Sequence, residues 1–319
     1  MENVRLFAGR GVIQLAEEVC EKHLPEISVA PHSLECFLNG CFRIRLETLV
    51  AGCEIFILQS LFPNPQEKLM EVWQLAWTAK AKGAKEITAF FSYDSYTRSD
   101  REDKPNTCIV SSLLAQLHQA AGIDRVAIIT PHFPQIAGFY GKMPVYLIKT
   151  IDIIVEHLQG LELDPKTTCV VAPDDNRIQD ARYVAASLNS LPVVVLLKDR
   201  LSHTETKIIG IVGEPRESCV IVDEEILSGG TIKSGVGYLE KLGARRFILA
   251  CTHGLLCGKA ASSFSKDPRI THIIATNTND AIYQLDLPKL TIISVAKRIA
   301  KVIEGLHFHK NLDDFLVRA

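Results

Sequence analysis

Short apolar runs rich in β-branched residues alternate with segments of helical periodicity along most of the chain. This alternation is typical of an α/β fold, in which helices connect mostly parallel strands. A final helix is expected over residues 294–307. The predicted strands cover residues 4–7, 53–58, 86–91, 126–129, 168–172, 193–197, 207–211, 219–222 and 247–251.

The length of 319 residues exceeds that of a typical single domain. A new helix begins near residues 149–151, where the strand pattern of the first half ends. We therefore predict an N-terminal domain over 1–149 and a C-terminal domain over 150–319.

A helix between the second and third predicted strands carries apolar residues at helical spacing, from Leu69 to Ala76. Trp73, Trp77 and Met70 belong to the same helix. Large apolar side chains on such a helix usually fill the core, so we expect all three to be core residues.

Composition excludes several classes of function. The formal net charge is −2 and no long basic stretch occurs, which argues against nucleic acid or a membrane as a partner. The nine cysteines are scattered without a CxxC pair, which argues against a disulfide framework or zinc site. The N-terminus has no apolar signal region, and no apolar run reaches ~18 residues. We expect a cytoplasmic protein.

An acidic run leads into a turn of small residues between residues 222 and 231. The apolar residues 218–222 predict a buried strand, and a helix is expected from Thr231. The turn therefore lies at a helix N-terminus, where free N–H groups favour an anion. Asp223 and Glu224 are placed to hold sugar hydroxyls or hydrated Mg²⁺. The segment predicts a phosphosugar site; the alternative is a tight turn with solvated acids.

The polar segment 92–106 follows the predicted strand 86–91 directly. One interpretation is a solvated loop. However, ligands of doubly wound sheets bind at the carboxyl ends of strands. The segment also places Tyr93 and Tyr96 beside arginines, a combination suited to stacking a base and pairing a triphosphate.

Taken together, these features resemble the phosphoribosyl pyrophosphate synthetases (ribose-phosphate diphosphokinases) over essentially the whole chain. The resemblance implies two phosphoribosyltransferase-like doubly wound domains, the N-terminal one on the nucleotide side and the C-terminal one carrying the sugar-phosphate loop. It also implies that the last helix packs back on the N-terminal domain and that the chain forms homo-oligomers, from dimers to hexamers. The supporting blocks are residues 5–9, 55–60, 93–101, 135–140, 173–174 and 222–231.

The activity that the resemblance implies is transfer of the diphosphoryl group of MgATP to the 1-hydroxyl of ribose 5-phosphate. Mg²⁺ is the implied cofactor. Such chemistry needs positioning and charge stabilisation more than covalent help from the protein.

The resemblance also assigns roles to individual residues. His132 and Asp174 match metal-binding positions, and His132 also contacts the nucleotide. Lys198 and Arg200 match the lysine and arginine of the catalytic loop. Taken alone, Lys198 and Arg200 also fit a solvated strand end, and His132 fits a turn. The remaining matches are Asn39, Gly40, Cys41, Arg98 and Ser99 for ATP, and Asp223, Glu224, Leu227, Ser228, Gly229, Gly230 and Thr231 for the sugar phosphate.

Several of these positions depart from the family pattern. Leu227 replaces an acid beside the sugar-phosphate loop, and Asp180 replaces an arginine. Asn176 and Arg177 replace a pair of glycines. Further departures are Thr130 for an acid, Ser99 for a glutamine, Ser228 for a threonine, and Asn39 and Cys41 for Asp and Glu.

The mixture of retained and lost residues allows three interpretations. The first is a working diphosphokinase. The second is a catalytically impaired homologue that regulates or assembles with an active paralogue. The third is diphosphoryl transfer to a different phosphosugar, with Leu227 and the pair Asn176 and Arg177 reshaping the pocket. Lys198 and the metal-binding residues favour the first, and Leu227 and Asp180 weigh against it.

Overall fold

The computed structural model describes residues 1, 3–200 and 206–317, and the side chains of residues 200, 206 and 207 are outside what it describes. The chain divides into two compact units. Unit 1 comprises residues 1–149, 278–281 and 294–319, and unit 2 comprises residues 150–277 and 282–293. No helix in the described part of the chain is long and apolar enough to cross a membrane.

Unit 1 is built on a five-stranded parallel sheet in the order β1-β4-β5-β6-β7. Its inner strands are buried on both faces, so they form continuous apolar runs instead of alternating ones. The strands are β1 (Val4–Ala8), β4 (Glu54–Ser60), β5 (Glu86–Tyr93), β6 (Arg125–Ile129) and β7 (Val145–Ile148). A separate antiparallel hairpin pairs β2 (His32–Cys36) with β3 (Phe42–Leu46).

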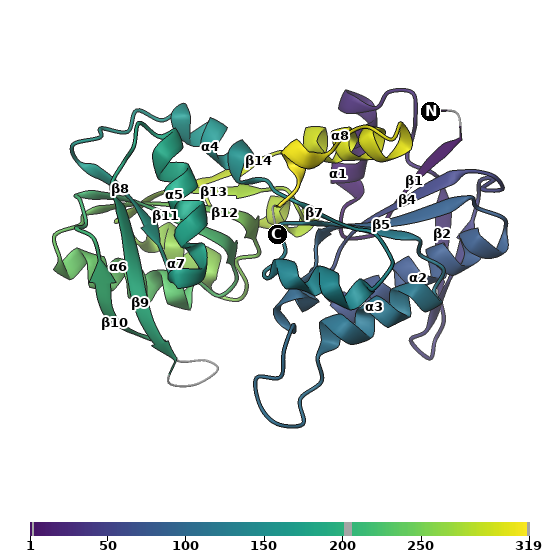
Figure 1. Ribbon diagram of the computed structural model, residues 1–319, viewed down its shortest axis with the longest axis horizontal. Helices are drawn as coiled ribbons and strands as arrows, with labels where there is room; N and C mark the ends of the chain where they lie inside the picture. Colours follow the sequence, from purple (N-terminus) through teal and green to yellow (C-terminus); the bar gives the residue numbers. More distant parts are fainter. Residues whose placement is uncertain (2, 201–205, 318–319) are drawn as a thin grey trace. The chain divides into compact units, whose positions relative to one another are not determined.

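Helices cover both faces of this sheet (Figure 1). On one face lie α2 (Pro65–Ala81) and α3 (Val110–Ala120), and on the other α1 (Ile13–Glu18) and α8 (Ala296–His307). A π-helical turn, η1 (Val19–His23), continues α1. The short 3-10 helices are η2 (Ser95–Arg98), η3 (Pro134–Tyr140) and η6 (Asp313–Phe315).

Unit 2 contains a seven-stranded sheet in the order β10-β9-β8-β11-β12-β13-β14. All neighbours are parallel except β10 and β9. The structure therefore confirms the predicted α/β class with mostly parallel sheets. The strands are β8 (Thr168–Ala172), β9 (Val193–Arg200), β10 (Thr206–Val212), β11 (Ser218–Ile226), β12 (Arg246–Gly254), β13 (Ile270–Thr276) and β14 (Leu290–Ile293).

Two separate apolar layers flank the sheet of unit 2. One layer packs α4 (Ile151–Gln159) and α5 (Ile178–Ser187) against the sheet, and α5 is preceded by η4 (Asp175–Arg177). The other layer packs α6 (Gly230–Lys241) and α7 (Ala260–Lys266). The short helix η5 (Asp280–Gln284) includes residues of both units. Successive side chains of β11 point to opposite faces of the sheet, so this strand contributes residues to both apolar layers.

One predicted part of the core is wrong. Met70 is 45% exposed and Trp77 is 65% exposed, whereas Trp73 packs against the core of unit 1. On α2, Leu69, Val72 and Ala76 define the buried stripe, and Met70 and Trp77 lie outside it. Membership of an amphipathic helix does not by itself bury a large side chain.

Candidate active site

The predicted catalytic lysine lies at the carboxyl edge of the unit 2 sheet. Lys198 belongs to β9, and Asp174 follows the end of the adjacent β8. The Nζ of Lys198 lies 3.6 Å from Oδ2 of Asp174, and its side chain is only 10% exposed. The solvated strand end is therefore wrong for Lys198. Arg200 is the last residue of β9, and its side chain lies outside the described part of the chain.

One carboxylate oxygen of Asp174 has no hydrogen-bond partner in the described part of the chain. Its Oδ1 is buried without a hydrogen-bond partner, although Oδ2 faces Lys198. A buried carboxylate oxygen of this kind suits Mg²⁺, which prefers oxygen ligands and keeps several of its waters. Within the described residues, no group of three or more His, Cys, Asp and Glu side chains is arranged to hold a metal by itself. A magnesium ion here would take one protein carboxylate and complete its shell with substrate and water.

The small-residue turn is open to an anion. Gly229 is the N-cap of α6 with φ of +73°, and a Cβ built there would lie 2.4 Å from Cζ of Phe264. Only glycine fits this position, for both backbone and steric reasons. The N-cap residue is a glycine and has no side chain to cap the first turn of α6, and Ser228 and Thr231 are exposed. The turn therefore presents backbone N–H groups and two hydroxyls at the positive end of a helix.

The acids before this turn are not solvated. β11 extends to Ile226, so Asp223 and Glu224 belong to the strand and not to a loop, and Glu224 is 5% exposed. The backbone N–H of Glu224 donates to Oδ1 of Asp223 at 2.9 Å. Burial, together with the neighbouring charge of Glu224, raises the pKa of Asp223 well above its usual value. The alternative of a turn with solvated acids is therefore wrong.

Arg177 connects the start of α5 to these acids. Its Nε lies 2.9 Å from Oε2 of Glu224, and its Nη1 donates to Oδ2 of Asp180 at 3.2 Å. Arg177 is 8% exposed, so both contacts are shielded from water. Burial raises the pKa of Asp180, and Arg177 partly offsets this rise. The two departures from the family pattern at positions 177 and 180 are thus one ion pair.

Leu227 lies between the acids and the open turn. Its side chain is 38% exposed, and its carbonyl accepts from the N–H of Cys257 at 2.8 Å. The backbone is thereby fixed while an apolar side chain faces solvent. Leu227 therefore cannot accept a hydrogen bond from a sugar hydroxyl.

The unit 1 residues predicted for ATP gather partly at the carboxyl edge of their own sheet. Arg98 ends η2 after β5, and His132 follows β6. The hydroxyl of Thr97 accepts from the N–H of His132 at 3.1 Å, which ties the two loops together. Arg98 is exposed, and the hydroxyl of Ser99 accepts from the N–H of Val110 at 3.1 Å. Ser99 therefore supports the start of α3.

The tyrosines of this segment do not match the stacking role predicted for them. Tyr93 is 4% exposed, and Tyr96 packs against the core of unit 1. Several polar residues of the segment, including Asp94 and Asp100, are buried as well. The first part of the segment therefore packs into unit 1, whereas residues 101–106 are all exposed, as expected for a solvated loop.

Asn39, Gly40 and Cys41 form the exposed turn of the β2/β3 hairpin, where Gly40 has φ of +85°. Oδ1 of Asn39 accepts from the N–H of Cys41 at 3.2 Å. The next residues of the hairpin are fixed to α2, because Gln74 bonds the N–H of Ile44 and the carbonyl of Phe42. The structure thus places this turn on the hairpin, outside the parallel sheet whose carboxyl edge carries Arg98 and His132.

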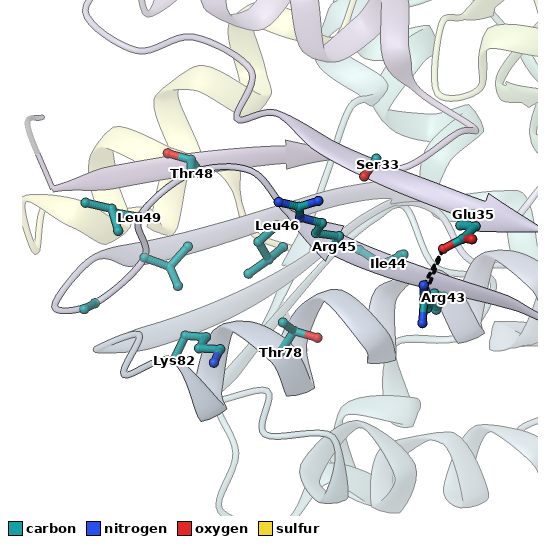
Figure 2. Close-up of a pocket in the computed structure, with 12 residues that line it drawn as sticks. Ser33, Glu35, Arg43, Ile44, Arg45, Leu46, Thr48, Leu49, Thr78 and Lys82 are labelled. Carbon is teal, nitrogen blue, oxygen red and sulfur yellow. Dashed lines mark hydrogen bonds and ion pairs between the residues drawn. The ribbon is translucent and has the colours of Figure 1, made fainter.

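Figure 2 shows a cavity of about 810 Å³ between this hairpin, the following loop and the end of α2. None of the residues predicted for the site lines it. Arg43 at its rim pairs with Glu35 at 2.7 Å. The cavity is therefore separate from the candidate site.

Comparison with known proteins identifies the family. A model of the N-terminal domain of ribose phosphate pyrophosphokinase matches residues 4–122. A ribose-phosphate pyrophosphokinase of Corynebacterium glutamicum is 31% identical, over 96% of this chain and 93% of its own. The chain belongs to the ribose-phosphate pyrophosphokinase family. A ribose-phosphate pyrophosphokinase of Aquifex aeolicus is 30% identical over 96% of both chains.

A solved ribose-phosphate pyrophosphokinase relative has the same fold. The crystal structure of phosphoribosylpyrophosphate synthetase from Mycobacterium smegmatis matches with a TM-score of 0.87 and 30% identity, over 96% of this chain and 99% of that one. The predicted family and the phosphoribosyltransferase-like fold are confirmed. The departures at Arg177, Asp180 and Leu227 therefore occur in a ribose-phosphate pyrophosphokinase family member that keeps the whole family fold.

Sequence reasoning missed the contact between Arg177 and Glu224. It treated the arginine only as a side chain in place of a glycine. One signal was available, because a new arginine at 177 accompanies a lost arginine at 180. Only the fold shows that Glu224, about 45 residues further along the chain, receives this charge.

Proposed function

We propose that this protein is a ribose-phosphate pyrophosphokinase that transfers the diphosphoryl group of ATP to ribose 5-phosphate, giving phosphoribosyl pyrophosphate and AMP. The observation that carries the proposal is the pairing of Lys198 with Asp174 at the sheet edge that also bears the open turn of α6. A buried lysine held by one carboxylate beside an anion-binding helix end suits phosphoryl transfer.

In this proposal, the first turn of α6 holds the 5-phosphate of the sugar through its N–H groups, with Ser228 and Thr231 as additional donors. Asp223 and Glu224 accept hydrogen bonds from the ribose hydroxyls. The phosphate and the hydroxyls are then both fixed, which aims the 1-hydroxyl of the sugar at the nucleotide.

The 1-hydroxyl oxygen forms a bond to the β-phosphorus of ATP, the bond from that phosphorus to the oxygen bridging the α-phosphate breaks, and AMP leaves as the hydroxyl proton is lost. Lys198 stabilises the negative charge that develops on the transferred group. Asp174, whose Oδ1 has no hydrogen-bond partner among the residues that the structure describes, is the proposed Mg²⁺ ligand of unit 2, and a bound ion would neutralise phosphate charge there. His132 is the proposed metal- and nucleotide-binding residue of unit 1. Arg98, Ser99 and the turn Asn39 to Cys41 are the proposed nucleotide-binding residues, and Arg200 is the proposed second cation of the loop.

The sugar substrate is ribose 5-phosphate or a related phosphosugar, because Leu227 removes one acceptor for a hydroxyl. We propose two domains that correspond to unit 1 and unit 2, with the first boundary at residue 149 and with residues 278–281 and 294–319 counted with unit 1. A homo-oligomeric assembly is proposed as the family resemblance implies. We also propose a cytoplasmic location, because all nine cysteines are free thiols, as a reducing compartment requires.

The test is release of AMP from ATP with and without ribose 5-phosphate, in the presence of Mg²⁺. The Gly229→Ala variant should lose binding of ribose 5-phosphate, because the new Cβ displaces the turn. Gly243→Ala is the matched control, since Gly243 also has positive φ but has nothing within 4 Å of a built Cβ. A wild-type protein that releases no AMP with any phosphosugar contradicts the proposed activity and leaves a regulatory or assembly role.

A further inference from the structure

The guanidinium of Arg177 lies among more carboxylates than it can neutralise. It contacts Glu224 at 2.9 Å and Asp180 at 3.2 Å. Burial alone would lower the pKa of Arg177, yet the pKa is raised because the surrounding carboxylates dominate. These carboxylates belong to Glu224, Asp180, Asp223 and Asp174.

The resemblance to the family implies a different position for this charge. The family pattern has glycine where Arg177 stands and arginine where Asp180 stands. Residues three apart at the start of a helix lie on the same side, so an arginine at either position is near the other. Relative to that pattern, the arginine stands three residues earlier in this chain, and the aspartate at position 180 forms an ion pair with it.

Glu224 shows what the exchange accomplishes. Its side chain reaches Arg177 at the start of α5, on the face of β11 where Val222 packs, and is 4% exposed. A carboxylate so deeply buried needs a paired cation to remain ionised. Nε of Arg177 supplies that cation and fixes Oε2 in one orientation.

We propose that Arg177 is a positioning residue for sugar binding, which pairs with Glu224 and holds it oriented toward the ribose hydroxyls, with Asp180 as its second anchor. The inference rests on the proposed function, since it concerns the same sugar site. The planar guanidinium makes its two contacts in different directions, from Nε and Nη1, which the point charge of lysine does not reproduce.

The experiment compares wild type with Arg177→Gly, Asp180→Arg and the double variant Arg177→Gly/Asp180→Arg, which restores the family arrangement. Arg177→Lys keeps the charge without the two-directional contact. Arg182→Ala removes a neighbouring exposed arginine of α5 and is the control. The measurements are the Kd of ribose 5-phosphate by calorimetry, KM and kcat for both substrates, and thermal unfolding.

We expect Arg177→Gly to raise the Kd and KM of ribose 5-phosphate about 10- to 100-fold, the effect of losing a hydrogen bond to a charged group. The KM of ATP should stay within about twofold, because Arg177 pairs with Glu224 and Asp180 in unit 2, whereas the proposed ATP-binding residues belong to unit 1. The double variant should recover most of the loss, and Arg177→Lys should fall between wild type and Arg177→Gly. Arg182→Ala should match wild type.

The proposal is overturned if folded Arg177→Gly binds ribose 5-phosphate as wild type does, or if the double variant is no better than the single one. If Arg177→Gly does not fold, unchanged sugar affinity in Arg177→Lys overturns it instead. A wild type that binds the sugar phosphate but releases no AMP contradicts only the proposed function. A wild type that binds no ribose 5-phosphate contradicts both.

Discussion

Two charged clusters lie at opposite kinds of sheet edge. At the amino edge of the unit 1 sheet, Arg125 of β6 bonds Glu54 of β4 and lies 3.2 Å from Glu86 of β5, while His307 of α8 lies 2.7 Å from Glu54. Two basic and two acidic side chains are matched there. Among the described side chains at the carboxyl edge of unit 2, Lys198 and Arg177 lie against four acids, Asp174, Asp180, Asp223 and Glu224.

The difference separates structural charge from functional charge. Arg125 begins its strand, as Glu54 and Glu86 begin theirs, so the amino-edge cluster fastens three strands together. Among the described residues, the carboxyl-edge cluster leaves the buried Oδ1 of Asp174 without a hydrogen-bond partner. An incomplete buried cluster costs stability, and in α/β sheets it occurs where ligands bind.

The strongest test of this contrast is Lys198→Ala. If the carboxyl edge is functional, the variant should lose about 10²–10³-fold in diphosphoryl transfer, because a preorganised cation is missing in the transition state. Binding of ribose 5-phosphate and the free energy of unfolding should change little. AMP release and calorimetry measure the two effects, and Lys241→Ala, at an exposed position on α6, is the control. Equal activity in both variants would contradict the role of Lys198.

Arg125→Leu should show the opposite result. Removing the cation leaves Glu54 and Glu86 without their buried partner, which should lower the free energy of unfolding by about 3–4 kcal/mol. The kcat of the folded variant should stay close to wild type. Urea unfolding gives the stability, and Arg246→Leu is the matched control, because Arg246 also begins a strand but pairs with Glu217 in an exposed position. A loss of activity without a loss of stability would break the comparison.

Asp94 extends the comparison to the carboxyl edge of unit 1. Burial raises the pKa of Asp94 to about 6, although its carboxylate accepts from the N–H of Tyr96. The folded state therefore binds a proton on Asp94 more tightly than the unfolded state does. The contribution of this protonation to the free energy of unfolding is complete below pH 3.8 and is lost as the pH rises through 6.

The Asp94→Asn variant carries no such charge. Relative to wild type, its free energy of unfolding should rise between pH 4 and pH 8 by at most about 3 kcal/mol. Denaturant unfolding across this range measures the difference. If the two proteins show parallel pH profiles, the buried carboxyl is not the source of the effect. Asp103→Asn, at an exposed position in the same segment, serves as the control.

The smallest expected effect is stabilisation by ligand. Because Oδ1 of Asp174 has no hydrogen-bond partner among the described residues, Mg²⁺ with ATP should stabilise the folded protein by about 2–3 kcal/mol at 100-fold the Kd. Asp174→Asn should reduce the part that depends on Mg²⁺. The melting temperature is the readout, with ATP plus EDTA as the comparison. No shift with millimolar MgATP would favour a role as an inactive assembly subunit.

Much of the fold follows from the sequence. The predicted strand at 168–172 has the bounds of β8, because a strand buried on both faces leaves an uninterrupted apolar run. The β2/β3 hairpin was not predicted as strands, since its side chains are mostly exposed or half-buried and its pattern carries little apolar signal. Trp77 was misplaced because burial on α2 depends on what the helix packs against.

The sequence predicts which residues form the candidate site, but not which side chains pair with one another there. A strand, an acidic run and a glycine turn before a helix were enough to predict the anion-binding end of α6. The strand β11 continues through Asp223 and Glu224 because it pairs with β12 there. The polar residues give no apolar strand pattern, so the sequence does not predict this extension. The pairing of Glu224 with Arg177 likewise depends on the tertiary structure. Arg177 follows β8, Glu224 belongs to β11, and the two strands are neighbours only in the folded sheet.

Residues 294–317 have a consequence for biogenesis. This segment follows all of unit 2 in the chain but belongs to unit 1, where Ser294 bonds Glu18 and Val317 bonds the carbonyl of Leu147. During synthesis from the N-terminus, the first half of the protein must therefore wait for these residues before its sheet is covered on both sides. A ribosome stalled anywhere within unit 2 would leave apolar surface of unit 1 open to chaperones.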